Sequence, residues 1–164
     1  MEFKWYAVYT KPRWEKKVAA GLSRNEIENY CPLNRVIKQW SDRKKIVEEP
    51  LFTSYVFVKI SLKQQHLLRQ IDGIVNFVYW LGKPAVIRED EIALIKQFLQ
   101  DHINITLERT PVNIHDRIKI ISGPFMEMEA KVIEVNKKTV KVILPSLGYI
   151  MTAEVEREHI QVVN

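Results

Sequence analysis

The side chains that most often carry out catalysis or hold metals are sparse in this sequence and far apart. No histidine has a cysteine or carboxylate at the spacing of a metal-binding motif; the four histidines are His66, His102, His115 and His159. Five glycines are too few to favour a glycine-rich phosphate loop, and there is no G-x-S-x-G motif. Cys31 has no histidine nearby, so we interpret it as a structural thiol. The sequence therefore predicts a protein that is not an enzyme and that uses no cofactor or metal.

The densest apolar stretch suits binding better than catalysis. Between Leu51 and Ile60 the only polar residues are Thr53, Ser54 and Lys59, and Pro50 separates the run from what precedes it. The run predicts one strand, with Tyr55 and Phe57 on one face and Val56, Val58 and Ile60 on the other. A strand that is apolar on both faces is usually central in a sheet and covered on both sides. The alternative is that the aromatic face is a docking patch for a partner.

Positive charge gathers in two segments. Residues 11–24 contain one acidic residue, Glu15, and five basic ones: Lys11, Arg13, Lys16, Lys17 and Arg24. Helical spacing places most of the basic residues roughly opposite an apolar side that holds Trp14, Val18 and Leu22. This basic face is either a solvated helix surface or a track for the phosphates of nucleic acid. A second basic cluster, with Asp42 as its acidic member, falls at residues 35–45. The net charge of +5 favours a polyanionic partner without requiring one.

Strands and helices must position these residues. We predict strands at 4–9, 27–33, 51–60, 74–80 and 85–87, a basic-tipped hairpin from 35–40 and 45–48, and helices at 13–24, 62–70 and 89–101. Ser61 and Gln64 have the spacing of a capping box at the second helix. Short β-rich runs at 117–121, 131–135, 139–144, 149–154 and 160–163 then predict a small barrel. The fold class is thus α+β, with a domain at 1–102, a linker at 103–113 and a second domain at 114–164.

Composition restricts the class of protein further. The hydrophobic fraction of 46% is that of a globular protein, and no apolar run approaches the ~20 residues that span a bilayer. A single cysteine excludes an internal disulfide and fits a reducing compartment. We therefore expect a cytoplasmic protein with no membrane partner.

Several segments, in this order, resemble one family. Residues 5–9 (WYAVY), 50–58 (PLFTSYVFV) and 73–78 (GIVNFV) are similar to the N-terminal (NGN) domain of the NusG family of transcription elongation factors. Residues 116–125 (DRIKIISGPF), followed by 132–135 (VIEV), resemble the KOW motif that this family carries. The resemblance covers essentially the whole chain. It implies an NGN domain with a mainly antiparallel sheet flanked by helices, followed by a small SH3-like KOW barrel.

Within the family, the segments Tyr30–Leu33 and Glu49–Phe52 look like the specialised antiterminators of the RfaH and UpxY types. Where general NusG proteins more often have Phe-Pro-Gly-Tyr, this chain has Phe52-Thr53-Ser54-Tyr55, and Ala130 stands at a usual glycine of the KOW motif. The likeness of the first two segments implies a specialised, bacterial member of the family, whereas Ala130 is a departure from the usual KOW pattern.

The resemblance also implies partners and a monomeric protein without catalytic activity. The NGN domain would bind the clamp helices of the RNA polymerase β′ subunit and face the gate loop of the β subunit, and so reduce pausing or termination. The matching positions are Tyr9, Phe52, Tyr55 and Phe57 for the clamp helices and His66 and Leu67 for the gate loop. The first helix would lie near non-template DNA, with Lys11, Arg13, Lys16, Lys17 and Arg24 as the contact residues. The KOW domain would recruit another partner, such as the ribosome or a termination factor.

Two alternatives stay open at this point. One is a housekeeping NusG-type elongation factor. The other is an RNA- or ribosome-binding protein that uses its KOW domain, although residues 112–164 carry equal numbers of basic and acidic residues, seven of each. For the aromatic residues, the alternative to a polymerase contact is burial in the core of their own domain.

Overall fold

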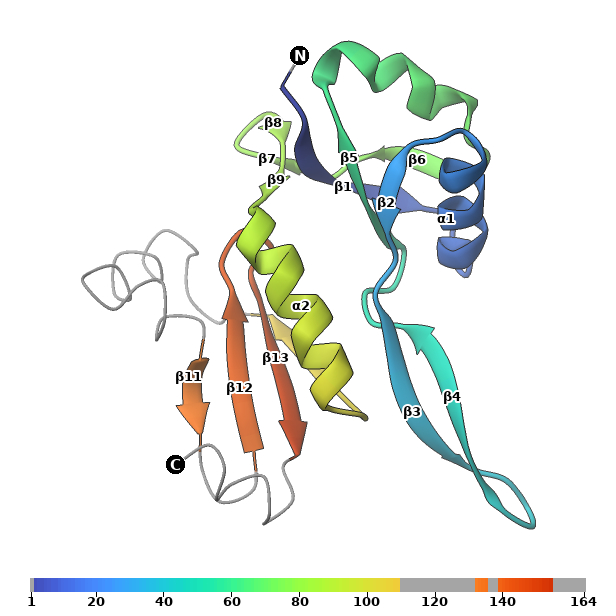
Figure 1. Cartoon of the computed structure of the whole chain (residues 1–164), viewed down its shortest axis with the longest axis vertical. Helices are drawn as coiled ribbons and strands as arrows, with labels where there is room; N and C mark the ends of the chain where they lie inside the picture. Colours follow the sequence, from blue (N-terminus) through green and yellow to red (C-terminus); the bar gives the residue numbers. More distant parts are fainter. Residues whose placement is uncertain (1, 110–131, 136–138, 155–164) are drawn as a thin grey trace. The chain divides into compact units, whose positions relative to one another are not determined.

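The computed structural model describes residues 2–109, 132–135 and 139–154 (Figure 1). These residues form two compact units. The first consists of Met1–Leu33 and Pro50–Lys96, and the second of Asn34–Glu49 and Gln97–Asn164. Each unit is described by itself below.

An antiparallel sheet forms the centre of the first unit. Its strands are β1 (Lys4–Thr10), β2 (Glu28–Tyr30), β5 (Tyr55–Ile60) and β6 (Ile74–Phe77), in the spatial order β2-β5-β1-β6. The short strand β9 (Val86–Ile87) also pairs with β1. Strand β1 pairs with β5 along its length, from Lys4 opposite Ile60 to Tyr9 opposite Tyr55. The predicted strands at 4–9 and 85–87 are therefore confirmed, and β5 is a central strand.

Two helices cover one face of this sheet. Val18 and Leu22 of α1 (Glu15–Arg24) and Leu68 of the 3-10 helix η1 (Leu62–Gln70) pack into one buried core with Val56 and Val58 of β5. The predicted capping box at the start of η1 is present. The Ser61 hydroxyl accepts from the backbone N–H of Lys63, and the Gln64 side chain accepts from the backbone N–H of Ser61. This core forms because every second residue of β1 and β5 is apolar and faces the helices.

The strand predicted from Leu51 begins only at Tyr55. Residues 51–54 form a turn, and Ser54 has a positive φ of 65° that a regular strand does not allow. This turn is held on one side by a hydrogen bond from the Thr10 N–H to the Ser54 carbonyl, at 2.9 Å. The continuous apolar run predicted Phe52 in the strand, but Phe52 lies in the turn before it.

Other strand predictions are shortened where the backbone cannot continue a ladder. The strand predicted at 27–33 is limited to β2, because Pro32 has no N–H to donate. The run at 74–80 is divided at Val78 into β6 and β7 (Tyr79–Trp80), and β7 pairs with β8 (Lys83–Pro84). The helix predicted at 89–101 is confirmed as α2 (Glu89–Asp101), whose residues 89–96 belong to the first unit.

The second unit contains a hairpin and a four-stranded sheet. The hairpin pairs β3 (Leu33–Gln39) with β4 (Lys44–Pro50), close to its predicted position. The sheet has the order β10-β13-β12-β11, in which β11 (Val132–Val135), β12 (Thr139–Leu144) and β13 (Tyr149–Glu154) match three of the five predicted barrel strands. The strands predicted at 117–121 and 160–163 lie outside the described residues.

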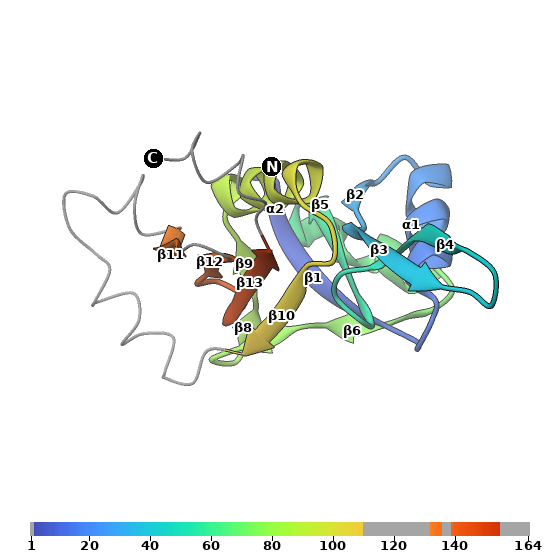
Figure 2. The same ribbon diagram turned by 90° about the horizontal axis from the view of Figure 1, so that it is seen from below.

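One strand of this sheet falls in the segment predicted as a linker. Residues Thr106–Arg109 form β10, which pairs with β13 from Thr106 opposite Thr152 to Arg109 opposite Tyr149 (Figure 2). Hydrogen bonding to β13, which the local sequence does not reveal, makes this polar segment a strand. The segment predicted as a linker thus contains a strand, and the domain boundaries at 1–102, 103–113 and 114–164 stay a prediction.

Candidate functional site

Five aromatic rings form one cluster on the face of the first sheet that α1 and η1 leave uncovered. This aromatic cluster consists of Tyr9, Tyr30, Phe52, Tyr55 and Phe57. Its ring centroids lie 5.1 Å apart for Tyr9 and Tyr55, and 5.5 Å apart for Phe52 and Phe57. Phe52 also stacks on Tyr55 at 6.3 Å, and Tyr30 lies 6.5 Å from Phe57, its partner in the strand register. The structure thus brings together four of the six predicted polymerase-binding residues.

The cluster has a buried floor and a more accessible rim. Phe57 is fully buried and Phe52 is 2% exposed, whereas Tyr55 is half-buried and Tyr9 is 39% exposed. The phenylalanines therefore act as packing beneath the tyrosines. Val56, Val58 and Ile60 lie on the opposite, core side, as the alternation predicted. Strand β5 is thus apolar on both faces because one face packs on the helices and the other carries the cluster.

Tyr30 is a member of the cluster that the sequence did not reveal. Burial, followed by the neighbouring Cys31 thiol, raises the pKa of Tyr30 to about 12, so its phenol is neutral at physiological pH. The ammonium of Lys96 lies 5.0 Å from the ring centroid, a cation–π distance. Only the pairing of β2 with β5 places Tyr30 beside Phe57, and that register cannot be read from a three-residue strand.

Cys31 lies next to the cluster and is held as a neutral thiol. Burial raises its pKa to about 11, the charge of Glu15 adds to the rise, and Lys16 opposes it. A thiol with this pKa is a poor nucleophile at neutral pH. This environment is the one expected for a structural cysteine.

A buried carboxylate fixes the turn that leads into the cluster. Glu15, the first residue of α1, is 4% exposed, and its Oε2 accepts a hydrogen bond from the backbone N–H of Ser54 at 2.8 Å. Ser54 directly precedes Tyr55. Because Ser54 has a positive φ, which costs a non-glycine residue energy, its conformation depends on such bonds. Glu15 thus connects the start of the basic helix to the aromatic cluster.

The two predicted gate-loop residues are not part of this cluster. His66 is exposed and Leu67 is half-buried, and both lie on η1. Because η1 packs against the core face of the sheet, these residues belong to a different surface. Their predicted contact with the polymerase stays a prediction.

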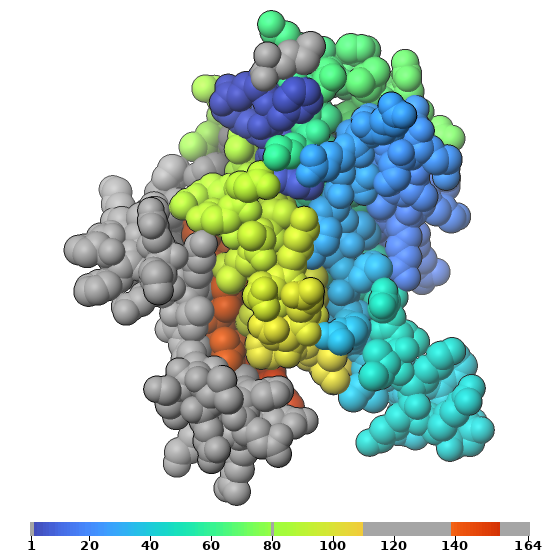
Figure 3. All heavy atoms as spheres, viewed as in Figure 1, coloured from blue at the N-terminus to red at the C-terminus, as the bar shows by residue number. Residues whose placement is uncertain are grey.

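All five predicted nucleic-acid-binding residues are exposed on or beside α1. They are Lys11, Arg13, Lys16, Lys17 and Arg24. The ammonium groups of Lys11 and Lys17 lie 5.1 and 4.8 Å from the ring centroid of the half-buried Trp14. Figure 3 shows α1, in blue, at the surface of the molecule. The helix therefore presents a cationic surface, which is what the prediction of a nucleic-acid contact requires.

Trp14 is positioned by close packing on Gly73. A Cβ built on Gly73 would lie 2.6 Å from a ring carbon of Trp14 and 2.8 Å from a methyl group of Val18. Gly73 also has a φ of 96°, in the region that favours glycine. No other residue fits this position without displacing the tryptophan that the two lysines contact.

Within the described residues, no group of three or more histidine, cysteine or acidic side chains could hold a metal ion. The described part of the chain also has no helix of the length and apolarity that a membrane span requires.

Comparisons with known proteins show what the chain is similar to. The family model described as "Transcription termination factor nusG" matches residues 3–96, which hold the aromatic cluster and the basic helix. The chain is 28% identical to the transcription termination/antitermination protein NusG of Streptococcus pyogenes, over 93% of this chain and 92% of that protein. It is 25% identical to the protein of the same name from Pseudomonas aeruginosa, over 99% of this chain and 98% of that protein.

A solved structure shares the fold. The structure described as "Domain interaction in Thermotoga maritima NusG" superposes with a TM-score of 0.50 and 21% identity, and covers 96% of this chain and 95% of that one. The antiparallel sheets and few helices described above are thus a NusG-like fold, and the β-rich C-terminal region is consistent with a KOW domain. The family match spans more than half of the sequence, and the chain belongs to the NusG family.

Proposed function

We propose that this protein is a transcription elongation or antitermination factor that binds RNA polymerase through the rim of the aromatic cluster. The observation that supports this proposal is the exposure of Tyr9 and the partial exposure of Tyr55 above a buried aromatic floor. Tyrosines on a rigid support are typical anchors of protein interfaces, because they bury much area and lose little conformational freedom. Membership of the NusG family points to the same role.

The mechanism involves no bond-making by this chain. A rigid body that binds the β′ clamp helices more tightly in the closed clamp than in the open one shifts the polymerase toward the closed, processive state. The sheet supplies the rigidity, since β5 is paired on both sides by β1 and β2. In this proposal His66 and Leu67 contact the β subunit, so that the protein bridges the β′ and β subunits of the polymerase.

The basic face of α1 would add an electrostatic contact with non-template DNA. Its five cations are exposed, and cations that neutralise phosphates release counterions and give salt-dependent affinity. This contribution is largely independent of DNA sequence. The KOW domain predicted at 114–164 would recruit a further partner, such as the ribosome or a termination factor. Within the family, residues 30–33 and 49–52 favour the specialised antiterminators.

A general NusG-type elongation factor is the second candidate. The observation that favours it is the name of the relatives from Streptococcus pyogenes and Pseudomonas aeruginosa, both of which are called NusG. A general factor changes pausing on every template, whereas a specialised one acts only downstream of a particular leader sequence. The same elongation assay distinguishes the two.

The experiment is an elongation assay with the polymerase of the source organism on templates with and without candidate leader sequences. We expect shorter pauses with the wild-type protein, and loss of both the effect and polymerase binding with the Tyr9→Ala/Tyr55→Ala double variant. Interface anchors of this type contribute about 2 kcal/mol each, so loss of both, about 4 kcal/mol, should weaken binding ~1,000-fold. Tyr79→Ala is the matched control, because Tyr79 is 52% exposed but outside the cluster. Pausing that is unchanged on every template would refute the proposal.

A further inference from the structure

The tip of the β3–β4 hairpin carries an exposed tryptophan between positive charges. Trp40 is 53% exposed, and its backbone N–H donates to the Arg43 carbonyl at 2.8 Å to close the turn. The ammonium of Lys45 lies 5.7 Å from the Trp40 ring centroid. We define the hairpin tip as residues 40–45. More than half of the surface of this large aromatic side chain is therefore in contact with water.

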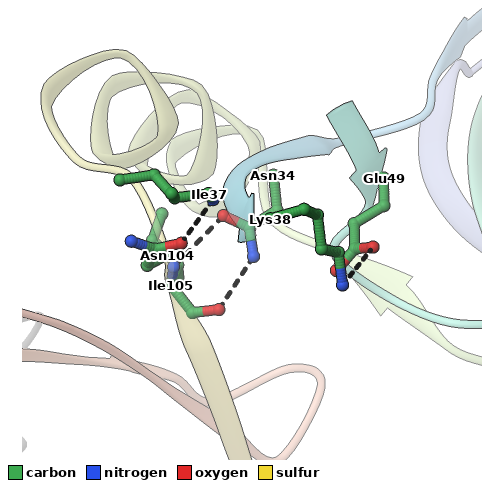
Figure 4. A network of polar contacts seen from close by, with 6 residues as sticks. All are labelled: Asn34, Ile37, Lys38, Glu49, Asn104 and Ile105. Atoms are coloured by element: carbon green, nitrogen blue, oxygen red, sulfur yellow. Dashed lines mark hydrogen bonds and ion pairs between the residues drawn. The ribbon is translucent and has the colours of Figure 1, made fainter. Parts of the chain in front are cut away.

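The base of the hairpin is fixed by hydrogen bonds, so that the tip is carried on a rigid arm. The buried Asn34 side chain donates to the Ile105 carbonyl at 2.8 Å and accepts from the Ile105 N–H at 3.2 Å (Figure 4). The Ile37 N–H donates to Asn104 Oδ1 at 2.9 Å. The Arg35 guanidinium donates to two carbonyls at the end of α2, both at 2.9 Å, where helix carbonyls otherwise lack partners. An arm held in this way loses little conformational entropy when its tip binds a ligand.

The charges at the tip are available to a polyanion. Lys38, which precedes the tip on β3, forms an ion pair with Glu49 at 3.6 Å. Arg43, Lys44 and Lys45 are exposed, and none of them forms a salt bridge with another residue of the described chain. Asp42 is the only acidic residue among residues 40–45. The tip therefore has a net positive charge next to an exposed ring.

We propose that the hairpin tip binds single-stranded DNA, with a base stacked on Trp40 and the adjoining phosphates on Arg43 and Lys44. A stacking ring needs an unpaired base, because the bases of a duplex already cover each other's faces, and flanking cations are needed for the backbone. The positive charges alone would suit any polyanion, so the ring is the feature that selects a single strand. This inference rests on the proposed function, in which the chain meets the displaced DNA strand of a transcription complex.

The test measures binding of the full chain to a fluorescein-labelled oligodeoxythymidylate by anisotropy at low salt, without polymerase. Trp40→Ala should weaken binding about 5- to 150-fold, the range for one stacked base, while Trp40→Phe should keep most of the affinity. The double variant Arg43→Ala/Lys44→Ala should reduce the slope of log K against log salt by about 1.4, from two phosphates at ~0.7 each. Lys63→Ala/Lys83→Ala removes the same charge from exposed positions elsewhere and should change the slope little.

Three results would overturn the inference. The first is unchanged DNA binding by Trp40→Ala, and the second is an equal loss in the Lys63/Lys83 control. The third is tighter binding of an oligouridylate RNA of the same length than of the DNA. Because Trp40 is exposed, circular dichroism should show each tip variant folded. The proposed function fails separately, through the elongation assay, since the binding experiment contains no polymerase.

Discussion

The hydrogen bond from Ser54 to Glu15 leads to a quantitative prediction about how the aromatic cluster is held. Glu15 is almost completely buried at the first position of α1, and its carboxylate accepts the Ser54 N–H at 2.8 Å. Glu15→Ala removes the acceptor and leaves that N–H to find water or to move. Glu15→Gln keeps one acceptor oxygen of the same reach, removes the charge and places an amide NH2 where the second oxygen stood. The pair of variants therefore separates the hydrogen bond from its charge.

The expected loss of stability follows from three contributions. A hydrogen bond to a charged group contributes about 1.5–3 kcal/mol, and an acidic residue in the first turn of a helix adds about 0.3–1 kcal/mol. The positive φ of Ser54 costs about 1–2 kcal/mol, which this hydrogen bond helps to offset. If the turn relaxes in Glu15→Ala, part of that cost is recovered and the loss of stability is smaller. We expect Glu15→Ala to lower the free energy of unfolding by about 2–3 kcal/mol, and Glu15→Gln by about 1 kcal/mol.

Two measurements check this prediction independently. Urea unfolding followed by tryptophan fluorescence gives the loss of stability. Alkylation of Cys31 reports the charge, because burial and then Glu15 raise the pKa of that thiol to about 11. Removing the charge should lower this pKa, so Cys31 in Glu15→Gln should react faster with iodoacetamide at pH 8 than in the wild type. A loss below 0.5 kcal/mol in Glu15→Ala, or equal alkylation rates, would refute the role given to Glu15.

Three further predictions follow from single contacts. Gly73→Ala should lower stability by about 1 kcal/mol more than Gly82→Ala in urea unfolding, because both glycines have positive φ but only Gly73 is in close contact with a tryptophan ring. Asn34→Ala should cost about 1–3 kcal/mol through its two buried hydrogen bonds to Ile105, and faster amide hydrogen exchange at Ile105 would show that these bonds are the cause. The pKa of Cys31 is raised from its ordinary value of 9.0 to about 11, so the native state holds the thiol proton more tightly than the unfolded state does. The contribution of this proton to stability should be fully present below pH 9 and should be lost between pH 9 and 11. In a pH series of thermal melts, Cys31→Ala should show a smaller fall in stability over that range than the wild type.

Local patterns were sufficient to predict the elements whose residues alternate clearly. Strands β12 and β13 begin and end where the short β-rich runs predicted them, and the capping box at Ser61 predicted the start of η1. The core side of β5 was also predicted, because successive side chains of a strand point to opposite faces of the sheet. These features need no knowledge of distant partners.

Long-range pairing decided the remaining features. Leu51 and Phe52 are as apolar as the strand that follows, so the sequence alone did not separate the turn from β5; hydrogen bonds from Thr10 and to Glu15 define that turn. Tyr30 joins the cluster only through the register of β2 on β5, and β10 exists only through its pairing with β13. Propensity is a weak guide wherever a partner strand supplies the hydrogen bonds.

The burial of Phe57 changes how the polymerase-binding surface must be tested. A double truncation of Tyr55 and Phe57 would remove one ring from the rim and one from the fully buried floor, so lost binding could arise from unfolding alone. Replacing a buried phenylalanine by alanine costs about 3–5 kcal/mol, which is a large part of the stability of a small domain. Truncation of Tyr9 and Tyr55 instead leaves both phenylalanines in place. The resemblance points to the strand that carries part of the aromatic cluster, and the structure adds which of its aromatic side chains are exposed enough to meet a partner and which are buried beneath them.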